Sequence, residues 1–241
     1  MTKLDEIFKR HKTAVLCYSG GKDSLALLLL CKPYWDRITV VWVNTGCQFP
    51  EVIEHMDKVR KLVPHYIELK GNQPEFFNEN GFPVDMVPEA NTNLGQFLLG
   101  EQPVKMCARF DCCGVNKWRP IEQFLLSVKP ECVLRADRDD ERAQGPNKYE
   151  GTEFCFPIFD WTVEDVWKFL QENAGDLLQE RHMMGFQTSL DCMCCTAYFR
   201  GYHERQEYLM KHHPQLYQKI ASFYKVYREI ALAELNKIKE N

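Results

Sequence analysis

The stretch AVLCYSGGKDSLALLLL, residues 14–30, decides the fold of this 241-residue chain. It begins as an apolar run typical of a buried strand, turns at two glycines, and continues as an apolar helix. Glycines at such a turn let the backbone approach a ligand closely, so that several N–H groups and the helix dipole face one anion. A lone Gly-Gly pair is common in ordinary turns, but six such residues between a strand and a helix favour a phosphate site. We predict a nucleotide-binding loop made of Ser19, Gly20, Gly21, Lys22, Asp23 and Ser24. Its spacing is not the Walker pattern, which needs four residues between the first glycine and Gly-Lys.

Alternating strands and helices follow the loop. Residues 38–43, ITVVWV, are apolar on both faces, as expected of a parallel strand covered by helices. A helix is predicted from Pro50, a strand over 65–69, and a further strand over 131–135. The alternation predicts an α/β fold with a doubly wound, mainly parallel sheet flanked by helices.

The remaining chain divides less regularly. Residues 71–104 lose their periodicity and carry Asn, Pro and Gly turn signals, which predicts an irregular insertion with a short helix near 96–99. After Pro214, apolar residues at three- and four-residue steps predict one long amphipathic helix, packed on the domain or on a partner. We therefore expect a nucleotide-binding domain over residues 1–200 and a C-terminal helical extension over residues 201–241.

Composition limits the classes of function. The net charge is −4, with 45% hydrophobic and 27% charged residues, so a broad basic surface for nucleic acid is absent. Nucleic acid stays possible as a substrate through a local patch. The longest apolar run, residues 24–31, is too short to span a bilayer, and the N-terminal residues form an amphipathic segment unlike a signal peptide. We expect a cytoplasmic protein with no membrane contact.

Eleven cysteines are many for a cytoplasmic chain, in which clustered thiolates more often hold metal than form disulfides. Six of them fall into two groups, Cys107 with Cys112 and Cys113, and Cys192 with Cys194 and Cys195. The other five stand in apolar or strand-like contexts and are predicted to act as small buried hydrophobes: Cys17, Cys31, Cys47, Cys132 and Cys155.

Five further segments extend the pattern of the loop: NTGCQFPE at 44–51, CC at 112–113, RDDER at 138–142, FPIFDWTVEDVW at 156–167 and CMCC at 192–195. In this order, over residues 14–200, the chain resembles the phosphoadenosine phosphosulfate (PAPS) reductase family. That family lies within the PP-loop ATP pyrophosphatases, the adenine nucleotide alpha hydrolase-like superfamily, whose members split ATP between the α- and β-phosphates. The resemblance implies an enzyme of sulfur metabolism that binds ATP or an adenylyl sulfonucleotide with Mg²⁺.

The resemblance also implies roles for individual residues. Lys22 and Asp23 would be catalytic, and the turn at Asn44, Thr45 and Gly46 would border the adenine and ribose. Asn44 stands where the family usually has Asp, so a ribose or metal contact there would lose its charge.

Arg138 and Arg142 lie roughly one helical turn apart and would grip phosphate or sulfate as further catalytic residues. The alternative is a solvated charge run, because the segment also carries Asp139, Asp140 and Glu141.

The two cysteine groups look like the halves of the iron–sulfur site of adenylyl-sulfate reductases. The resemblance implies a [4Fe–4S] cluster on Cys112, Cys113, Cys192 and Cys195, with Cys107 and Cys194 as spare ligands. Four thiolates also suit tetrahedral zinc, so zinc and unmetallated thiols remain alternatives. The histidines at 182, 203, 212 and 213 are weaker candidates, and we assign them no role.

The sequence differs from the family pattern in two ways, and these differences leave three hypotheses about function. Sulfonucleotide reductases attack with a cysteine in a C-terminal tail, whereas no cysteine follows Cys195 here, and adenylyl-sulfate reductases typically lack the intact loop. The first hypothesis is therefore adenylation of, or sulfur transfer to, an unknown acceptor. The second is a sulfonucleotide reductase that uses Cys107, Cys194 or an external thiol. The third is a non-catalytic nucleotide-binding subunit whose C-terminal helix binds a partner protein or a second copy.

Overall fold

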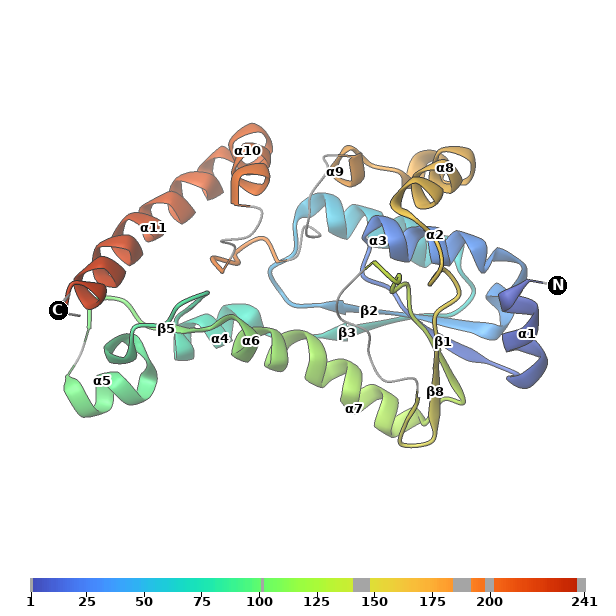
Figure 1. Cartoon of the computed structure of the whole chain (residues 1–241), viewed down its shortest axis with the longest axis horizontal. Coiled ribbons are helices and arrows are strands. Elements are labelled where there is room, and N and C mark those ends of the chain that lie inside the picture. Colours follow the sequence, from blue (N-terminus) through green and yellow to red (C-terminus); the bar gives the residue numbers. More distant parts are fainter. Residues whose placement is uncertain (1, 101, 141–147, 184–191, 198–201, 238–241) are drawn as a thin grey trace. The chain divides into compact units, whose positions relative to one another are not determined.

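A six-stranded sheet forms the centre of the first of two compact units in the computed structural model (Figure 1). The structure describes residues 2–100, 102–140, 148–183, 192–197 and 202–237. The strands lie in the order β3-β2-β1-β6-β8-β7, and every pair except β7 with β8 is parallel. Their bounds are β1 (Ala14–Cys17), β2 (Ile38–Asn44), β3 (Tyr66–Lys70), β6 (Cys132–Leu134), β7 (Lys148–Tyr149) and β8 (Thr152–Cys155).

Helices flank this sheet, which confirms the predicted fold class. In Figure 1, α2, α3 and α8 lie above the sheet and α7 below it. Leu16 on β1 and Leu25 on α2 are fully buried, so the strand and the helix on either side of the loop both pack into the core. The helices of this unit are α1 (Lys3–Arg10), α2 (Lys22–Leu30), α3 (Pro50–Leu62), α7 (Arg119–Val128), α8 (Val163–Asn173) and α9 (Glu180–Met183). Short 3₁₀ turns cover Lys32–Arg37 and Gly175–Leu177.

The second unit combines residues 45–48, residues 71–118 and the described parts of 184–241. Its helices are α4 (Gln73–Asn80), α5 (Asn93–Leu99), α6 (Arg109–Cys113), α10 (Tyr202–His212) and α11 (Pro214–Leu235). Two short parallel strands, β4 (Phe82–Val84) and β5 (Met106–Ala108), accompany them, with a 3₁₀ turn over Glu89–Asn91 and a π turn over Gly114–Trp118.

The irregular insertion predicted over residues 71–104 is wrong in part, because α4 and β4 lie within it. The Asn and Gly residues taken as turn signals are helix boundaries instead. Asn72 accepts a hydrogen bond from the Glu75 amide at 3.4 Å and caps α4, and Gly81, at φ +78°, ends it. The short helix predicted near 96–99 is present as the end of α5.

The long helix predicted after Pro214 is present as α11, and it packs within the second unit. Tyr227 is buried beside Val84 and Met106, and its hydroxyl donates to the Met86 carbonyl at 2.7 Å. The Tyr224 hydroxyl donates to the Thr196 carbonyl at 2.8 Å. The boundary predicted between residues 200 and 201 stays a prediction. Among the helices of the described residues, none combines the length and apolarity needed to cross a bilayer.

Candidate functional site

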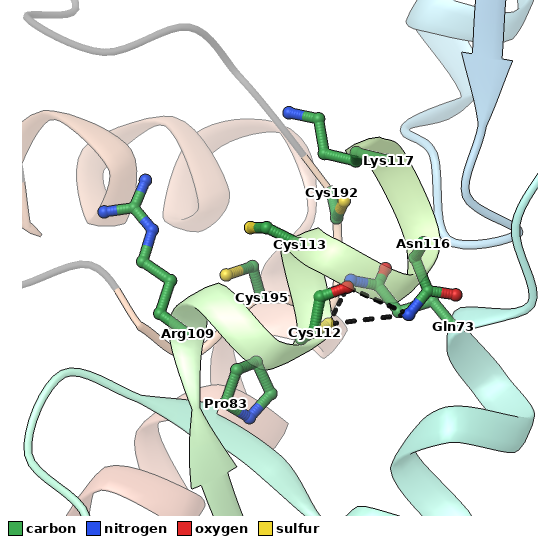
Figure 2. Close-up of a pocket in the computed structure, with 9 residues that line it drawn as sticks. All are labelled: Gln73, Pro83, Arg109, Cys112, Cys113, Asn116, Lys117, Cys192 and Cys195. Atoms are coloured by element: carbon green, nitrogen blue, oxygen red, sulfur yellow. Dashed lines mark hydrogen bonds between the residues drawn. The ribbon is translucent and has the colours of Figure 1, made fainter. Parts of the chain in front are cut away.

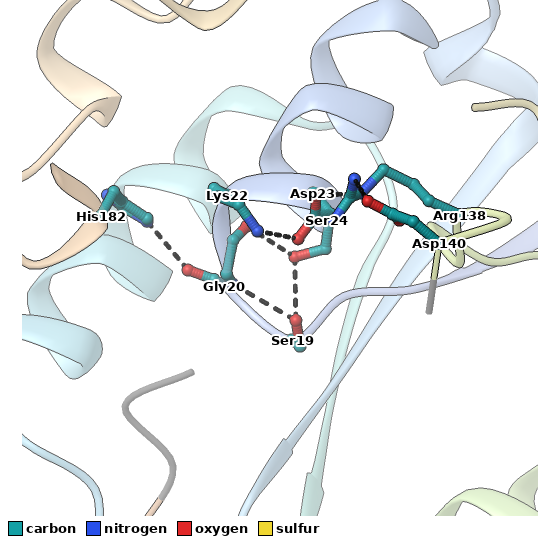
Figure 3. A network of polar contacts seen from close by, with 9 residues as sticks. Ser19, Gly20, Lys22, Asp23, Ser24, Arg138, Asp140 and His182 are labelled. Carbon is teal, nitrogen blue, oxygen red and sulfur yellow. Dashed lines mark hydrogen bonds and ion pairs between the residues drawn. The ribbon is translucent and has the colours of Figure 1, made fainter. Parts of the chain in front are cut away.

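The loop predicted to bind a nucleotide lies where β1 ends and α2 begins, at the carboxyl edge of the parallel sheet. Gly20 has φ +78°, a conformation that glycine adopts without strain, and Gly21 is the N-cap of α2. The Ser19 and Ser24 hydroxyls are 3.0 Å apart, and Ser24 also donates to the Gly21 carbonyl at 3.0 Å (Figure 3). The loop is thus fixed by its own side chains, with the amino end of a nine-residue helix beside it.

Asp23 is held between two cations. Lys22 Nζ lies 2.7 Å from Asp23 Oδ2, and Arg138 Nε lies 2.9 Å from Asp23 Oδ1. Arg138 also donates to Asp140 Oδ2 at 2.8 Å, and its side chain is only 5% exposed (Figure 3). A solvated charge run does not describe Arg138, because the structure buries it against the loop 115 residues away in sequence. Arg142 lies outside the described residues.

The loop is also contacted by Arg181, which no sequence pattern indicated, and by His182, a weak candidate to which no role was assigned. Arg181 Nη1 and His182 Nε2 both contact the Gly20 carbonyl oxygen, each at 2.9 Å. Because these contacts hold the Gly20 carbonyl oxygen, this oxygen is not free to turn toward the loop and repel an anion there. Both side chains come from α9 and are buried. Their sequence carries no spacing relation to the loop, so only the fold reveals this contact.

Burial holds His182 neutral, and this gives a testable pH dependence. Desolvation, with Arg181 beside it, lowers the pKa of His182 from 6.5 to about 4. Between these values the unfolded chain binds a proton that the folded protein does not, so stability is present above pH 6.5 and falls as the pH drops toward 4. The free energy of unfolding of wild type should fall as the pH drops over this interval. We expect the corresponding fall in His182→Gln to be smaller by on the order of 2 kcal/mol. Urea titrations at pH 7 and 4.5 measure it, and equal losses in both proteins would contradict it.

The turn predicted to border the nucleotide divides between the two units. Asn44 ends β2 in the first unit and donates to Glu68 Oε1 at 3.0 Å. Thr45 belongs to the second unit, is fully buried, and donates to Cys192 Sγ at 3.3 Å. Gly46 has φ +86° and forms the turn itself. Nucleotide binding by these three residues stays a prediction.

The four cysteines predicted to hold a metal line one pocket in the second unit. Cys112 and Cys113 end α6, and Cys192 and Cys195 come from the segment near residue 195. Figure 2 shows the four side chains gathered around α6. The other residues that line the pocket are Gln73, Pro83, Arg109, Asn116 and Lys117. Two thiol-bearing segments about 80 residues apart in sequence are thus brought together by the fold.

Buried polar groups donate to the sulfurs of this pocket. Gln73 Nε2 lies 3.3 Å from Cys112 Sγ, and Thr45 Oγ1 lies 3.3 Å from Cys192 Sγ. Arg205 Nη2 donates to the Cys192 carbonyl at 2.9 Å and orients that segment. Burial raises the pKa of the Cys112 thiol to about 11, and the hydrogen bond from Gln73 opposes this. Donors aimed at sulfur fit thiolates that carry charge, as metal-bound cysteines do.

The two spare cysteines have other contacts. Cys107 is buried and donates to the Gly81 carbonyl at 3.6 Å, and burial raises the pKa of its thiol to about 12. Cys194 accepts a hydrogen bond from Cys47, which lowers the pKa of Cys194 to about 7 and raises that of Cys47. Neither Cys107 nor Cys194 lines the pocket. The buried position predicted for Cys47 is present, but its contact with Cys194 was not foreseen.

Comparisons with known proteins identify the family of this chain. The family model of the phosphoadenosine phosphosulfate reductase domain matches residues 13–198. An uncharacterized protein of Methanocaldococcus jannaschii is 26% identical over 220 residues, 90% of this chain, and the chain spans about half of that relative (49%). An adenosine 5'-phosphosulfate reductase of Bacillus anthracis is 23% identical over 205 residues, 81% of each chain.

Among solved structures, a phosphoadenylyl-sulfate reductase from Candida auris, crystallised as a phosphate complex, superposes with a TM-score of 0.55 at 17% identity. The superposition covers 78% of this chain and 85% of that one. At this identity the likeness shows the fold.

Proposed function

Because the chain belongs to the phosphoadenosine phosphosulfate reductase domain family, whose members are enzymes, we propose that it binds ATP or an adenylyl sulfonucleotide with Mg²⁺ on residues 19–24. One observation carries this proposal: Asp23 is held between Lys22 and Arg138 at the amino end of α2. Such a site offers backbone N–H groups, a helix dipole and two cations to a phosphate chain, and a carboxylate to a magnesium ion.

The proposed reaction is transfer of AMP, or of sulfur, to an acceptor that we do not assign. In the adenylation step, an acceptor oxygen forms a bond to the α-phosphorus. The bond from that phosphorus to the bridging oxygen breaks, and pyrophosphate leaves with the electron pair. In this proposal the loop amides and Lys22 hold the phosphates, and Arg138, which contacts Asp23, neutralises developing negative charge. Positioning and charge neutralisation thus supply most of the rate enhancement.

We further propose that Cys112, Cys113, Cys192 and Cys195 hold a [4Fe–4S] cluster. The hydrogen bonds from Gln73 and Thr45 to two of these sulfurs support it, and Arg109 and Lys117 line the pocket with positive charge that offsets the thiolates. A cluster bound to these four cysteines would supply electron transfer or a binding site for sulfide. Tetrahedral zinc is the alternative, because it takes the same four donors.

A second candidate function is sulfonucleotide reduction by a thiol of this chain. Cys194 is half-buried and hydrogen-bonded to Cys47 within the unit that carries the four metal-site cysteines, which supports it as an attacking thiol. Its sulfur would attack the sulfur of the sulfonucleotide and expel the adenosine phosphate. An external dithiol such as thioredoxin would then release sulfite and take up the oxidation as a disulfide. A cytoplasmic location and a protein partner at α11 stay predictions.

Product analysis separates the two candidates. The anaerobically purified full chain is incubated with ATP, adenylyl sulfate or PAPS, with Mg²⁺ and with or without thioredoxin. AMP and pyrophosphate from ATP, lost in the Lys22 variant described below, support adenylation. Sulfite release that needs thioredoxin and disappears in Cys194→Ser supports reduction instead and overturns the main proposal.

Removal of the Lys22 ammonium is expected to weaken binding of MgATP roughly 10- to 100-fold, because a charge-assisted contact to phosphate is lost. Lys22→Ala leaves α2 intact, since alanine is a strong helix former. Isothermal titration calorimetry with a non-hydrolysable ATP analogue measures the change. Lys58→Ala, which removes a surface lysine paired with Glu54, is the matched control. Equal affinity in both variants would contradict the loop assignment.

A further inference from the structure

A second group of metal-binding side chains lies in the first unit, which also carries the nucleotide loop. His11 follows directly after α1, Cys132 begins β6, and Cys155 ends β8. The ligand atoms of these three residues all lie within 4.8 Å of one another. No residue is shared with the four-cysteine pocket of the second unit. We propose that His11, Cys132 and Cys155 form a separate binding site for a zinc-class divalent metal ion.

The strand register explains how the three ligands meet. Strands β6 and β8 are parallel neighbours, and Cys132 is paired with Glu153. Glu153 and Cys155 are two residues apart on β8, so their side chains project from the same face of the sheet. Cys132 projects from this face too, because paired residues on neighbouring strands share a side. The end of α1 then places His11 over these residues, where its ring contacts Glu153.

The donor set selects a class of metal. Two thiols and an imidazole suit zinc and similar borderline-soft ions, and they disfavour magnesium and calcium, which take oxygen. From standard zinc–sulfur and zinc–nitrogen bond lengths, ligand atoms of a tetrahedral site lie about 3.6 Å apart. Atoms already within 4.8 Å of one another reach that separation by small side-chain movements. Cys132 is fully buried and Cys155 is 6% exposed, so water competes little for the bound ion.

Glu153 contacts two of the three proposed ligands. Its Oε2 lies 2.8 Å from His11 Nε2, and its Oε1 lies 3.4 Å from Cys155 Sγ and 2.7 Å from Arg10 Nη2. A carboxylate in this position fixes the histidine ring through the nitrogen that does not bind the metal, as carboxylates do around zinc-bound histidines. The prediction that Cys132 and Cys155 are simple hydrophobes therefore omits the polar groups that the fold places beside them.

A metal ion bound here would have a structural role. It would join the chain just after α1 to two neighbouring strands of the central sheet. Because binding to the folded state alone stabilises that state by mass action, added zinc would raise the melting temperature. The site does not depend on the proposed nucleotide chemistry, so its test is independent of the reaction.

Zinc content and thermal stability of the full chain test the proposal. The protein is purified anaerobically, dialysed against EDTA, loaded with zinc chloride, and freed of excess metal. We expect His11→Ala to bind one zinc fewer per chain than wild type and to show a smaller zinc-dependent rise in melting temperature. His65→Ala, which removes an exposed histidine of the same unit, is the matched control and should keep both.

A cobalt titration distinguishes the two-cysteine site from the four-cysteine pocket. We expect Cys113→Ser to retain the Co²⁺–thiolate absorption of the two-cysteine site and His11→Ala to lose that part of the spectrum. Of the three proposed ligands, His11 is the one whose replacement should disturb folding least, because its side chain lies at the edge of the core. Circular dichroism checks that the variant is folded. His11→Gln gives a second variant that keeps polar character. Equal zinc content in wild type and both His11 variants, or loss of all zinc in Cys113→Ser alone, would overturn the site.

Discussion

Iron and acid-labile sulfide are expected to fall almost to zero when Cys112 or Cys192 is replaced by serine, whereas wild type should hold about four irons per chain. Both cysteines line the pocket, and their sulfurs accept hydrogen bonds from Gln73 and Thr45. Loss of one of four thiolates leaves an iron with an alkoxide or water ligand, which weakens a cluster strongly. Iron, sulfide and zinc analysis of anaerobic protein measures the loss, and visible absorption follows it.

Cys107→Ala is the matched control for these variants. Cys107 belongs to the same group in the sequence, but its sulfur donates to the Gly81 carbonyl and does not line the pocket. We expect this variant to keep its iron. A colourless wild-type protein loaded with zinc would exclude the cluster in favour of the zinc alternative. Iron loss in Cys107→Ala with retention in Cys113→Ser would reassign the fourth ligand.

Arg138→Ala is expected to lower kcat/KM for the AMP-forming reaction by about two to three orders of magnitude. The guanidinium binds Asp23, which also binds Lys22, so its removal disturbs both cations of the loop. Because Arg138 is almost fully buried, the variant should also lose on the order of 1–3 kcal/mol of stability. Arg138→Lys should recover part of the stability and little of the rate, since ammonium lacks the fork geometry.

Arg135→Ala separates this effect from a general loss of charge. Arg135 lies three residues earlier, is one-third exposed, and pairs with Asp137 at 2.7 Å. Its replacement should change the rate by less than threefold, because Arg135 pairs with Asp137 and not with Asp23 of the loop. Steady-state kinetics and urea unfolding of all three variants provide the comparison. Equal rate losses in Arg135→Ala and Arg138→Ala would contradict a specific role for Arg138.

Local patterns predicted the elements that position the site. The strand–loop–helix at residues 14–30 was readable because apolar runs bracket a Gly-Gly turn, and both runs are buried. The helix α8 likewise has a local start signal, a capping box in which Thr162 accepts from the Asp165 amide at 3.1 Å. Each of these signals depends on residues within a few positions of one another.

The missed features depend on contacts between distant residues. The contacts of Arg181 and His182 with the Gly20 carbonyl cross about 160 residues, and no periodic pattern records such a contact. Cys132 and Cys155 looked like ordinary core residues because His11, which lies beside both, comes from a distant segment. In the second unit, α4 escaped prediction because its Asn72 cap and Gly81 end resemble the turn residues of a loop.

The products of ATP turnover test the central claim most directly. The full chain is incubated anaerobically with α-labelled ATP, Mg²⁺ and a deproteinised cell extract as a source of acceptors, beside Lys22→Ala and Arg138→Ala. We expect label in AMP or in an adenylated acceptor, equimolar pyrophosphate, and loss of both in the two variants. Formation of ADP and phosphate as the Lys22-dependent products, or no binding of ATP or any adenylyl sulfonucleotide by wild type, would contradict the account.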